Sequence, residues 1–226
     1  MKILSILPVL TLVSLNLATG QGYFRVSGDY SIKAKAADGT AQLVIGKFYY
    51  DRNIRKIVYV NTFPEKEIWL TADTTLYQLV DDTVVTRQTV PPVAVFSIFH
   101  LCLANKLNQF GLQSSAFKIG RVEQKEDMVI TTWEPPRSHS RMFGKVMISN
   151  KERKLYGIVF FDKDGAIVKK QFFSKYLSIN GLEFPGEVVE ILYDEGHESY
   201  RITKYKNIVL DDLSNEILYN YPIPGN

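Results

Sequence analysis

The sequence predicts a mainly β protein that consists of an antiparallel meander interrupted by one helical segment. Tyrosine and phenylalanine number 13 each, and aromatic residues favour half-buried strands. Turn pairs that end in glycine separate runs in which apolar and polar residues alternate. One stretch, residues 91–110, breaks this strand pattern and has the apolar spacing of a helix.

The N-terminus has the organisation of a secretory signal peptide. Lys2 is followed by an apolar run from Ile3 to Leu17 and by small residues up to Gly20, where we expect cleavage. A membrane anchor is the alternative, but the run is shorter than the roughly 20 apolar residues of a spanning helix. We therefore expect residues 1–20 to be removed and residues 21–226 to form one soluble periplasmic domain.

The composition excludes several classes of function. Removal of Lys2 would lower the formal net charge from +3 to +2, which is too weak to favour nucleic acid or an anionic membrane surface. Cys102 is the single cysteine, so a scaffold held by intrachain disulfides is excluded. Because Cys102 lies within the apolar stretch, we expect it to be an inert small hydrophobe. A monomer that binds no nucleic acid is expected.

Four turn pairs indicate hairpins between neighbouring strands. Glycine at the second position supplies the positive φ that tight hairpin turns require, and about five strands before the helical segment and six after it are expected. Alternation is less regular in EVVEILY, residues 187–193, where Glu187 and Glu190 are three positions apart. The four pairs are Asp38-Gly39, Asp164-Gly165, Asn180-Gly181 and Glu195-Gly196.

The segment PPVAVFSIFHLCLANKLNQF, residues 91–110, predicts a helix that starts at Pro91-Pro92 and stops before Gly111. A helix that is apolar nearly all round is either buried on both sides or faces an apolar ligand. It therefore either completes a filled core or covers a pocket. Residues 134–141 are expected to form a loop. The apolar residues at helical spacing are Phe96, Phe99, Leu103, Leu107 and Phe110.

The sequence contains no recognisable catalytic or metal-binding constellation. His100, His139 and His197 are scattered, and a zinc site needs several converging nitrogen or sulfur ligands. Asp162 and Asp164 resemble the start of a calcium loop, but the later ligands are missing. We expect no enzyme, no metal and no cofactor. Adjacent carboxylates are expected in solvated turns, and the remaining places to look for catalysis are Glu67, His100 and Arg137.

Residues 46–82 contain a series of strand and turn motifs: a glycine before an aromatic strand, a basic residue at the end of that strand, a strand that ends near proline, and a later Thr-Leu-aromatic strand. The residues are Gly46, Phe48–Tyr50, Arg52, Tyr59, Pro64, Ile68–Leu70 and Thr75-Leu76-Tyr77. The C-terminal part contains DKDG, NGLEFPGEVV and a closing strand before an apolar-proline tail. Both parts resemble the LolA-like family of periplasmic lipoprotein carriers, which shows the same order of motifs.

This resemblance implies a half-open β-barrel, a strongly curved antiparallel sheet with a helical lid or plug around residues 91–110. It implies a carrier that shields lipoprotein acyl chains between an inner-membrane ABC transporter and an outer-membrane acceptor. Arg52 matches an arginine that locks the lid to backbone, although Asn53 replaces the usual proline. The amphipathic helix that starts family carriers is not evident in residues 21–39, so another lipid is an alternative cargo.

The resulting hypothesis is a non-catalytic binding protein with an apolar interior. Its alternative is a structural or interaction module of the cell envelope with a filled core. A shift of one residue in register would move a whole strand's set to the other face. The candidate residues for lining the apolar interior are Phe48, Tyr50, Trp69, Leu76, Phe96, Phe99, Leu103, Trp133, Phe143 and Phe160.

Overall fold

The computed structural model describes residues 22–225, and most of these lie in strands. The strands are β1 (Arg25–Lys35), β2 (Ala41–Asp51), β3 (Lys56–Phe63), β4 (Glu67–Ala72), β5 (Thr75–Val80), β6 (Thr83–Thr89), β7 (Lys118–Lys125), β8 (Met128–Glu134), β9 (Val146–Lys151), β10 (Lys154–Phe161), β11 (Ile167–Ser174), β12 (Leu177–Ile179), β13 (Leu182–Phe184), β14 (Glu187–Asp194) and β15 (His197–Leu210). The helices are α1 (Ile98–Leu103) and α2 (Glu216–Tyr219), with 3₁₀ turns η1 (Val93–Phe96), η2 (Leu107–Gln109), η3 (Leu112–Ser114) and η4 (Arg137–His139).

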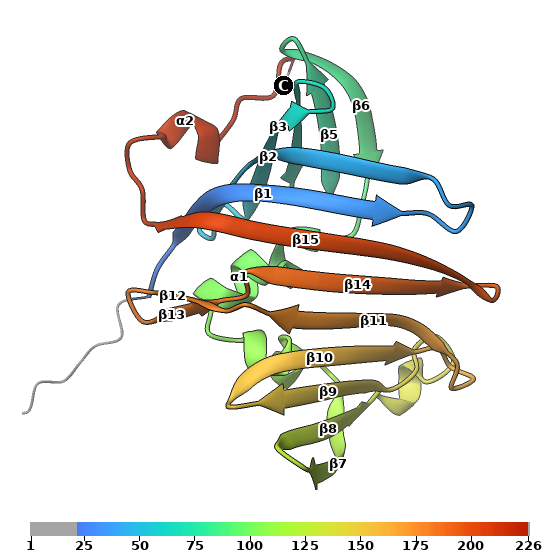
Figure 1. Cartoon of the computed structure of the whole chain (residues 1–226). Helices are drawn as coiled ribbons and strands as arrows, with labels where there is room; N and C mark the ends of the chain where they lie inside the picture. Colours follow the sequence, from blue (N-terminus) through green and yellow to red (C-terminus); the bar gives the residue numbers. More distant parts are fainter. Residues whose placement is uncertain (1–21, 226) are drawn as a thin grey trace, which may run out of the picture.

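Thirteen strands form one antiparallel sheet in the order β6-β5-β4-β3-β2-β1-β15-β14-β11-β10-β9-β8-β7. The order ends at β6 and β7, so the sheet is open. Figure 1 shows its bend, because β1, β15 and β14 run across the view while β3 and β5 run steeply up it. The mainly β, antiparallel, half-open architecture expected from the sequence is confirmed. The hairpin β12–β13 forms a separate small sheet.

The hairpins at glycine turns are confirmed, but other turns were missed. Gly39, Gly165, Gly181 and Gly196 all have positive φ and connect β1–β2, β10–β11, β12–β13 and β14–β15. Six strands precede the helical segment and nine follow it, against the expected five and six. The turn between β5 and β6 uses Asp81 (φ 47°) and Asp82 (φ 56°), so no glycine marked it in the sequence.

The two faces of the sheet bury two separate groups of apolar side chains. We call inner the face that carries Phe48, Tyr50 and Ile57 and packs against α1. We call outer the opposite face, on which Tyr49 and Val58 pack around Tyr219 of α2. Alternation along β2 and β3 therefore sends successive residues into different cores, as the two-residue period of a strand requires.

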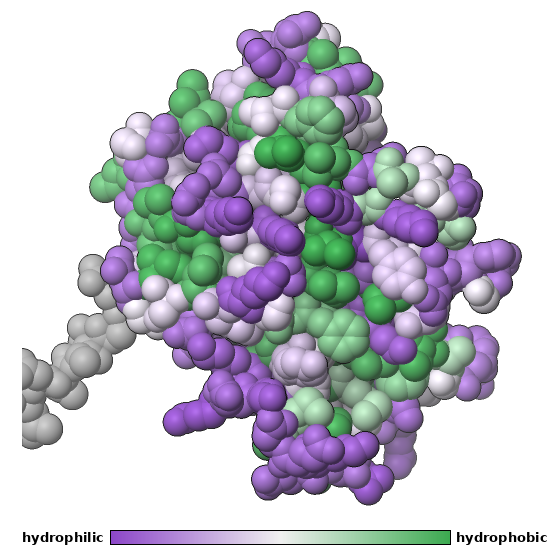
Figure 2. Space-filling model, in the orientation of Figure 1, coloured by the Kyte–Doolittle hydropathy of each residue, from purple (hydrophilic) through white to green (hydrophobic). Residues whose placement is uncertain are grey.

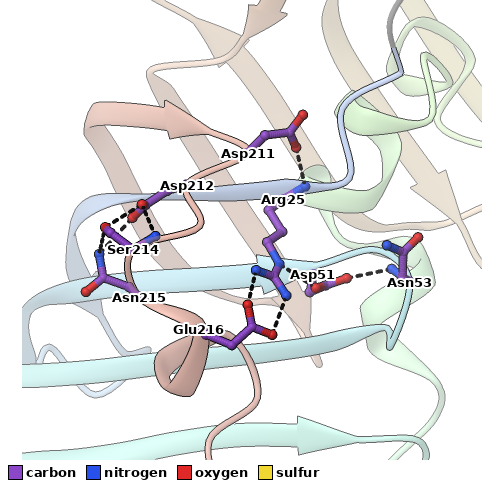
Figure 3. A network of polar contacts seen from close by, with 8 residues as sticks. All are labelled: Arg25, Asp51, Asn53, Asp211, Asp212, Ser214, Asn215 and Glu216. Carbon is purple, nitrogen blue, oxygen red and sulfur yellow. Dashed lines mark hydrogen bonds and ion pairs between the residues drawn. The ribbon is translucent and has the colours of Figure 1, made fainter.

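The C-terminal segment is fastened to the outer face by the polar network drawn in Figure 3. Arg25 donates from Nε to Asp51 Oδ2 at 2.6 Å and from both terminal nitrogens to the carboxylate of Glu216. The guanidinium also lies 4.8 Å from the ring centroid of Tyr219. Asp211 Oδ1 accepts from the backbone N–H of Arg25 at 3.0 Å. One arginine thus connects β1, β2 and α2.

The predicted helix over residues 91–110 is present as short helical pieces. Ser97 has extended backbone (φ −70°, ψ 152°), which separates η1 from α1, and its Oγ accepts from the N–H of His100. After α1, Asn105 (φ 54°) and Phe110 (φ 47°) adopt left-handed backbone. These residues interrupt the helix and divide it into short pieces. We call residues 91–115 together the lid segment.

Two large apolar side chains are exposed to solvent in α2 and in the residues just before it. Leu213 and Ile217 are 69% and 64% exposed, and Figure 2 shows hydrophobic atoms at the left, where Figure 1 places this segment. The predicted signal peptide, residues 1–20, lies outside the described residues. Within residues 22–225, no helix has the length and hydrophobicity needed to cross a membrane.

Candidate functional site: a cavity beneath the lid segment

A cavity of about 450 Å³ lies between the lid segment and the inner face of the sheet. Its walls come from β3, β4, β5, β11, β14 and β15, with the lid segment opposite. The lining residues are Ile57, Tyr59, Thr71, Leu76, Val93, Phe96, Ser97, Ile98, Phe99, Phe110, Lys169, Gln171, Val188, Glu190, Arg201, Thr203 and Tyr205.

Phe99 is the apolar centre of the site and is 1% exposed. Its ring stacks on Phe48 with 4.4 Å between ring centroids and lies edge-on to Tyr205 at 5.8 Å. Phe184, from the β12–β13 hairpin, stacks with both rings, at 6.3 Å from Phe99 and 6.4 Å from Phe48. Offset and edge-on aromatic contacts of this kind stabilise beyond the area that they bury. The ring of Phe99 therefore packs against aromatic side chains from three separate strands, β2, β13 and β15.

Polar contacts also hold the lid segment to β2. Arg52 follows the last residue of β2, and its Nη1 donates to the carbonyl oxygen of Leu103 at 2.9 Å. Leu103 ends α1, where backbone carbonyls have no partner inside the helix. The hydroxyl of Tyr50 lies 2.7 Å from Nδ1 of His100. Burial, and then the positive charges of Arg52, Arg55 and Lys106, lower the pKa of His100 from its ordinary value.

One end of the cavity is polar. Gln171 of β11, Glu190 of β14 and Arg201 of β15 stand directly opposite one another across the three strands. Lys169 Nζ lies 2.6 Å from Glu190 Oε2, and Arg201 Nη1 lies 3.4 Å from Glu190 Oε1. Burial alone would raise the pKa of Glu190, but Lys169, Arg201 and the Gln171 amide together hold it below its usual value.

The structure distributes the predicted lining residues over several places. Leu76, Phe96 and Phe99 line the cavity. Phe48, Tyr50 and Trp133 are buried in the inner core, and Phe160 packs against it. The other three predicted residues do not line the cavity. Trp69 pairs with Tyr59 of the inner face, and Leu103 lines a second pocket of about 660 Å³ on the β12–β13 side of α1. Phe143 is 49% exposed and lies near His139.

The polar lining residues were not predicted as part of the site. Their only trace in the sequence was the irregular alternation of EVVEILY. The structure explains it, because Glu187 belongs to the outer face while Glu190 shares the inner face with Val188. A charge at an inward position of a central strand is a signal for a functional or structural polar cluster. Arg201 and Lys169 could be placed beside it only once strand pairing was known.

The places considered for catalysis have other roles in the structure. Glu67 accepts hydrogen bonds from Asn61 and Gln78 at 2.9 and 2.6 Å. His100 contacts Tyr50, and Arg137 lies in the exposed turn η4. Cys102 is buried, and burial raises the pKa of its thiol well above the ordinary value. Residues 22–225 contain no group of three or more side chains placed to hold a metal ion.

Three solved structures share this architecture over most of their length. A LolA superfamily protein from Nitrosomonas europaea aligns with a TM-score of 0.56 and 15% identity, covering 88% of this chain and 90% of that one. The chain has the LolA-like fold. A DUF1329 family protein from Desulfovibrio piger gives 0.60 and 12%, covering 89% and 91%.

A domain assigned as an outer membrane lipoprotein-sorting protein, from Vibrio parahaemolyticus, aligns with a TM-score of 0.58 and 11% identity, covering 88% of this chain and 91% of that one. No protein-family model and no curated protein sequence matches the chain. At such identities the likeness concerns the fold alone. The LolA-like fold predicted from residues 46–82 and the C-terminal pattern is confirmed.

Proposed function

We propose that this LolA-like chain is a non-catalytic periplasmic carrier that shields lipoprotein acyl chains, or another apolar ligand, on the way to the outer membrane. The observation that carries the proposal is the cavity of about 450 Å³ between the lid segment and the inner face. Ligand sites are typically clefts of roughly 300–1,000 Å³ with mainly apolar walls and a few polar groups. Leu76, Phe96 and Phe99 supply such walls.

The lid segment would admit the ligand by moving away from β2. Its polar fastenings to that strand, Arg52 to the carbonyl of Leu103 and Tyr50 to His100, exchange readily for water. Separating Phe99 from Phe48 exposes aromatic surface, and an acyl chain would cover it again. Because each buried methylene contributes about 0.8 kcal/mol, a chain of ordinary length offsets the loss of these contacts.

The partners follow from the same proposal. One solved neighbour is described as an outer membrane lipoprotein-sorting domain and another as a LolA superfamily protein, which supports a role in the cell envelope. We infer that an inner-membrane ABC transporter supplies the cargo and an outer-membrane acceptor receives it. Residues 21–226 would act as a single domain and a monomer.

Native mass spectrometry of protein exported to the periplasm tests the proposal. We expect adducts with the mass of acyl lipids or lipoproteins on the wild-type protein. Phe96→Glu should remove them, because Phe96 lines the cavity and its 62% exposure lets the variant fold. The matched control is Phe143→Glu, an exposed phenylalanine outside the cavity.

The alternative function, a structural module with a filled core, predicts a different outcome. The full burial of Phe48, Tyr50 and Trp133 shows that much of the inner face is packed, as such a module requires. If no lipid adduct is found on the wild-type protein, and apolar probes do not bind to it, the carrier proposal is wrong and the structural module is favoured.

A further inference from the structure

The cavity has a chemically divided wall. Along β15 the inward residues are Arg201, Thr203 and Tyr205 in succession, and Tyr205 packs on Phe99. At about 3.3 Å per residue, Arg201 lies roughly 13 Å along the strand from Tyr205. One end of the same cavity is therefore aromatic and the other end is ionic, which is the division expected for an amphiphile rather than for a purely apolar molecule.

The ionic end carries an excess of positive charge. The charged residues that line the cavity are Lys169, Glu190 and Arg201, which sum to one positive charge when Glu190 is ionised. Lys169 is committed to Glu190 at 2.6 Å, whereas Arg201 stands at 3.4 Å with 54% of its side chain exposed. Arg201 therefore retains donors that can turn to an anion at the cavity mouth, and guanidinium groups bind carboxylate and phosphate in a forked geometry.

A second observation points to the same place. Nε2 of Gln171 donates to Glu190 Oε2 at 2.7 Å, while its buried Oε1 has no hydrogen-bond partner within residues 22–225. Buried polar atoms are nearly always paired, and an amide oxygen accepts a donor such as a head-group hydroxyl. The paired strands β11, β14 and β15 thus offer a cation for an acidic group and a free acceptor for a hydroxyl of the same head group.

We propose that Arg201, positioned by Glu190 with Lys169 beside it, binds the anionic head group of an acyl amphiphile whose chain lies against Phe99 beneath the lid segment, and that Gln171 Oε1 accepts from a hydroxyl where the head group carries one. This inference rests on the proposed carrier function and specifies its ligand class: one acyl chain or more joined to a carboxylate or a phosphate. Glu190 holds the two cations in place and limits the local excess to one charge, which matches a single acidic group.

Displacement of the neutral fluorophore N-phenylnaphthylamine by ligands of equal chain length tests this. We expect laurate or dodecyl phosphate to displace the probe at lower concentration than dodecanol does, and dodecyltrimethylammonium to be weakest. Inorganic phosphate alone should displace nothing, which separates an amphiphile from a free anion. Whichever of laurate and dodecyl phosphate is stronger identifies the head group.

The variants isolate the head-group contact. Arg201→Gln should weaken laurate binding about tenfold, the worth of one charge-assisted hydrogen bond, and leave dodecanol binding unchanged, while Arg201→Lys should restore part of the difference. Lys204→Gln is the matched control, a lysine on the outer face of the same strand that pairs with Glu187. Equal binding of laurate and dodecanol to the wild-type protein would overturn this inference alone; failure of every acyl ligand to bind would overturn the carrier function.

Discussion

Two single residues of the sheet, Gly46 and Glu190, show how backbone packing and buried charge restrict the side chain at a position. Gly46 shows this on β2, because a Cβ at this position would lie 2.3 Å from the carbonyl oxygen of Val60 on β3. A glycine is required there for the close approach of two backbones, which explains its place before the aromatic strand in the sequence pattern. Glu190 shows the opposite case, a buried carboxylate that neighbouring cations keep ionised.

His100 should make stability depend on pH. Its folded-state pKa lies below the ordinary value of 6.5, so the unfolded chain binds a proton more readily than the folded one does. Stability is therefore lost as pH falls below about 6.5 and towards the folded-state pKa. His100→Gln, which keeps a hydrogen-bonding group beside Tyr50, should lose less stability between pH 7.5 and 5.5, values chosen to bracket about pH 6.5.

Urea unfolding of both proteins at the two pH values measures this difference. The control is His139→Gln, since His139 lies exposed in the η4 loop away from the lid segment. Identical losses of unfolding free energy in the wild type and the His100→Gln variant would show that His100 does not contribute.

At the scale of elements, the lid segment is held more by packing than by its own helicity. α1 has six residues, Ile98–Leu103, and isolated helices shorter than about 12–15 residues are marginal in water. Four of its side chains, Phe99, Leu101, Cys102 and Leu103, are buried. The element is therefore helical because the inner face of the sheet receives these side chains, and its opening exposes them together.

The contact between Arg52 and the end of α1 gives the element-scale prediction. Arg52→Leu should raise hydrogen exchange at the amides of Leu101 and Ala104, because the carbonyl of Leu103 loses its side-chain partner. We expect protection in β2 and β3 to stay as in the wild type. Hydrogen exchange with mass spectrometry resolves the two regions.

Arg137→Leu is the control for this experiment, because it removes the same charge from an exposed turn. If α1 exchanges equally in the wild type and both variants, Arg52 does not lock the lid segment.

Across the molecule, the C-terminal segment covers the outer face of the sheet over β2, β3, β4 and β5. Tyr219 is fully buried against Tyr49 and Val58, and Lys56 donates to the carbonyl of Tyr221 at 2.6 Å. The last described residues thus cover strands that lie near the other end of the sequence. The C-terminal segment and the lid segment therefore pack on opposite faces of the sheet.

Arg25→Met tests this division. Asp51 has a side-chain exposure of 3%, and removal of its cation leaves a buried carboxylate short of a partner, which costs about 1–3 kcal/mol or more. We expect a lower free energy of unfolding in urea. Glu216→Gln, at the 69% exposed end of the network, should cost clearly less.

The cavity beneath the lid segment serves as the internal control, because Arg25 lies on the opposite face of the sheet. Displacement of N-phenylnaphthylamine by laurate should be unchanged in folded Arg25→Met protein. A large loss of binding with unchanged stability would contradict the separation of the two faces.

The local structure of this protein can be predicted from its amino-acid sequence. Alternating aromatic and β-branched runs specify strands, and Gly39, Gly165, Gly181 and Gly196 specify hairpins, because both effects act between near neighbours in the chain. The lid segment was also predicted from the sequence, since Pro91-Pro92 and the helical spacing after it are local signals. Its division at Ser97 and Asn105 was not, because extended and left-handed backbone at such residues is imposed by packing.

Which strands and helices meet on the same face of the sheet depends on the three-dimensional packing of the chain. The pairing of β15 with β1 and β14 places Arg201 on the inner face, where it lines the same cavity as Phe99, although about a hundred positions separate the two in the numbering. Contacts such as Arg52 to Leu103 and Arg25 to Glu216 join residues that lie far apart in the sequence, so no local pattern predicts them. The cavity and its ionic end arise from this long-range pairing, because a strand's pattern fixes its two faces but not the neighbours that each face meets.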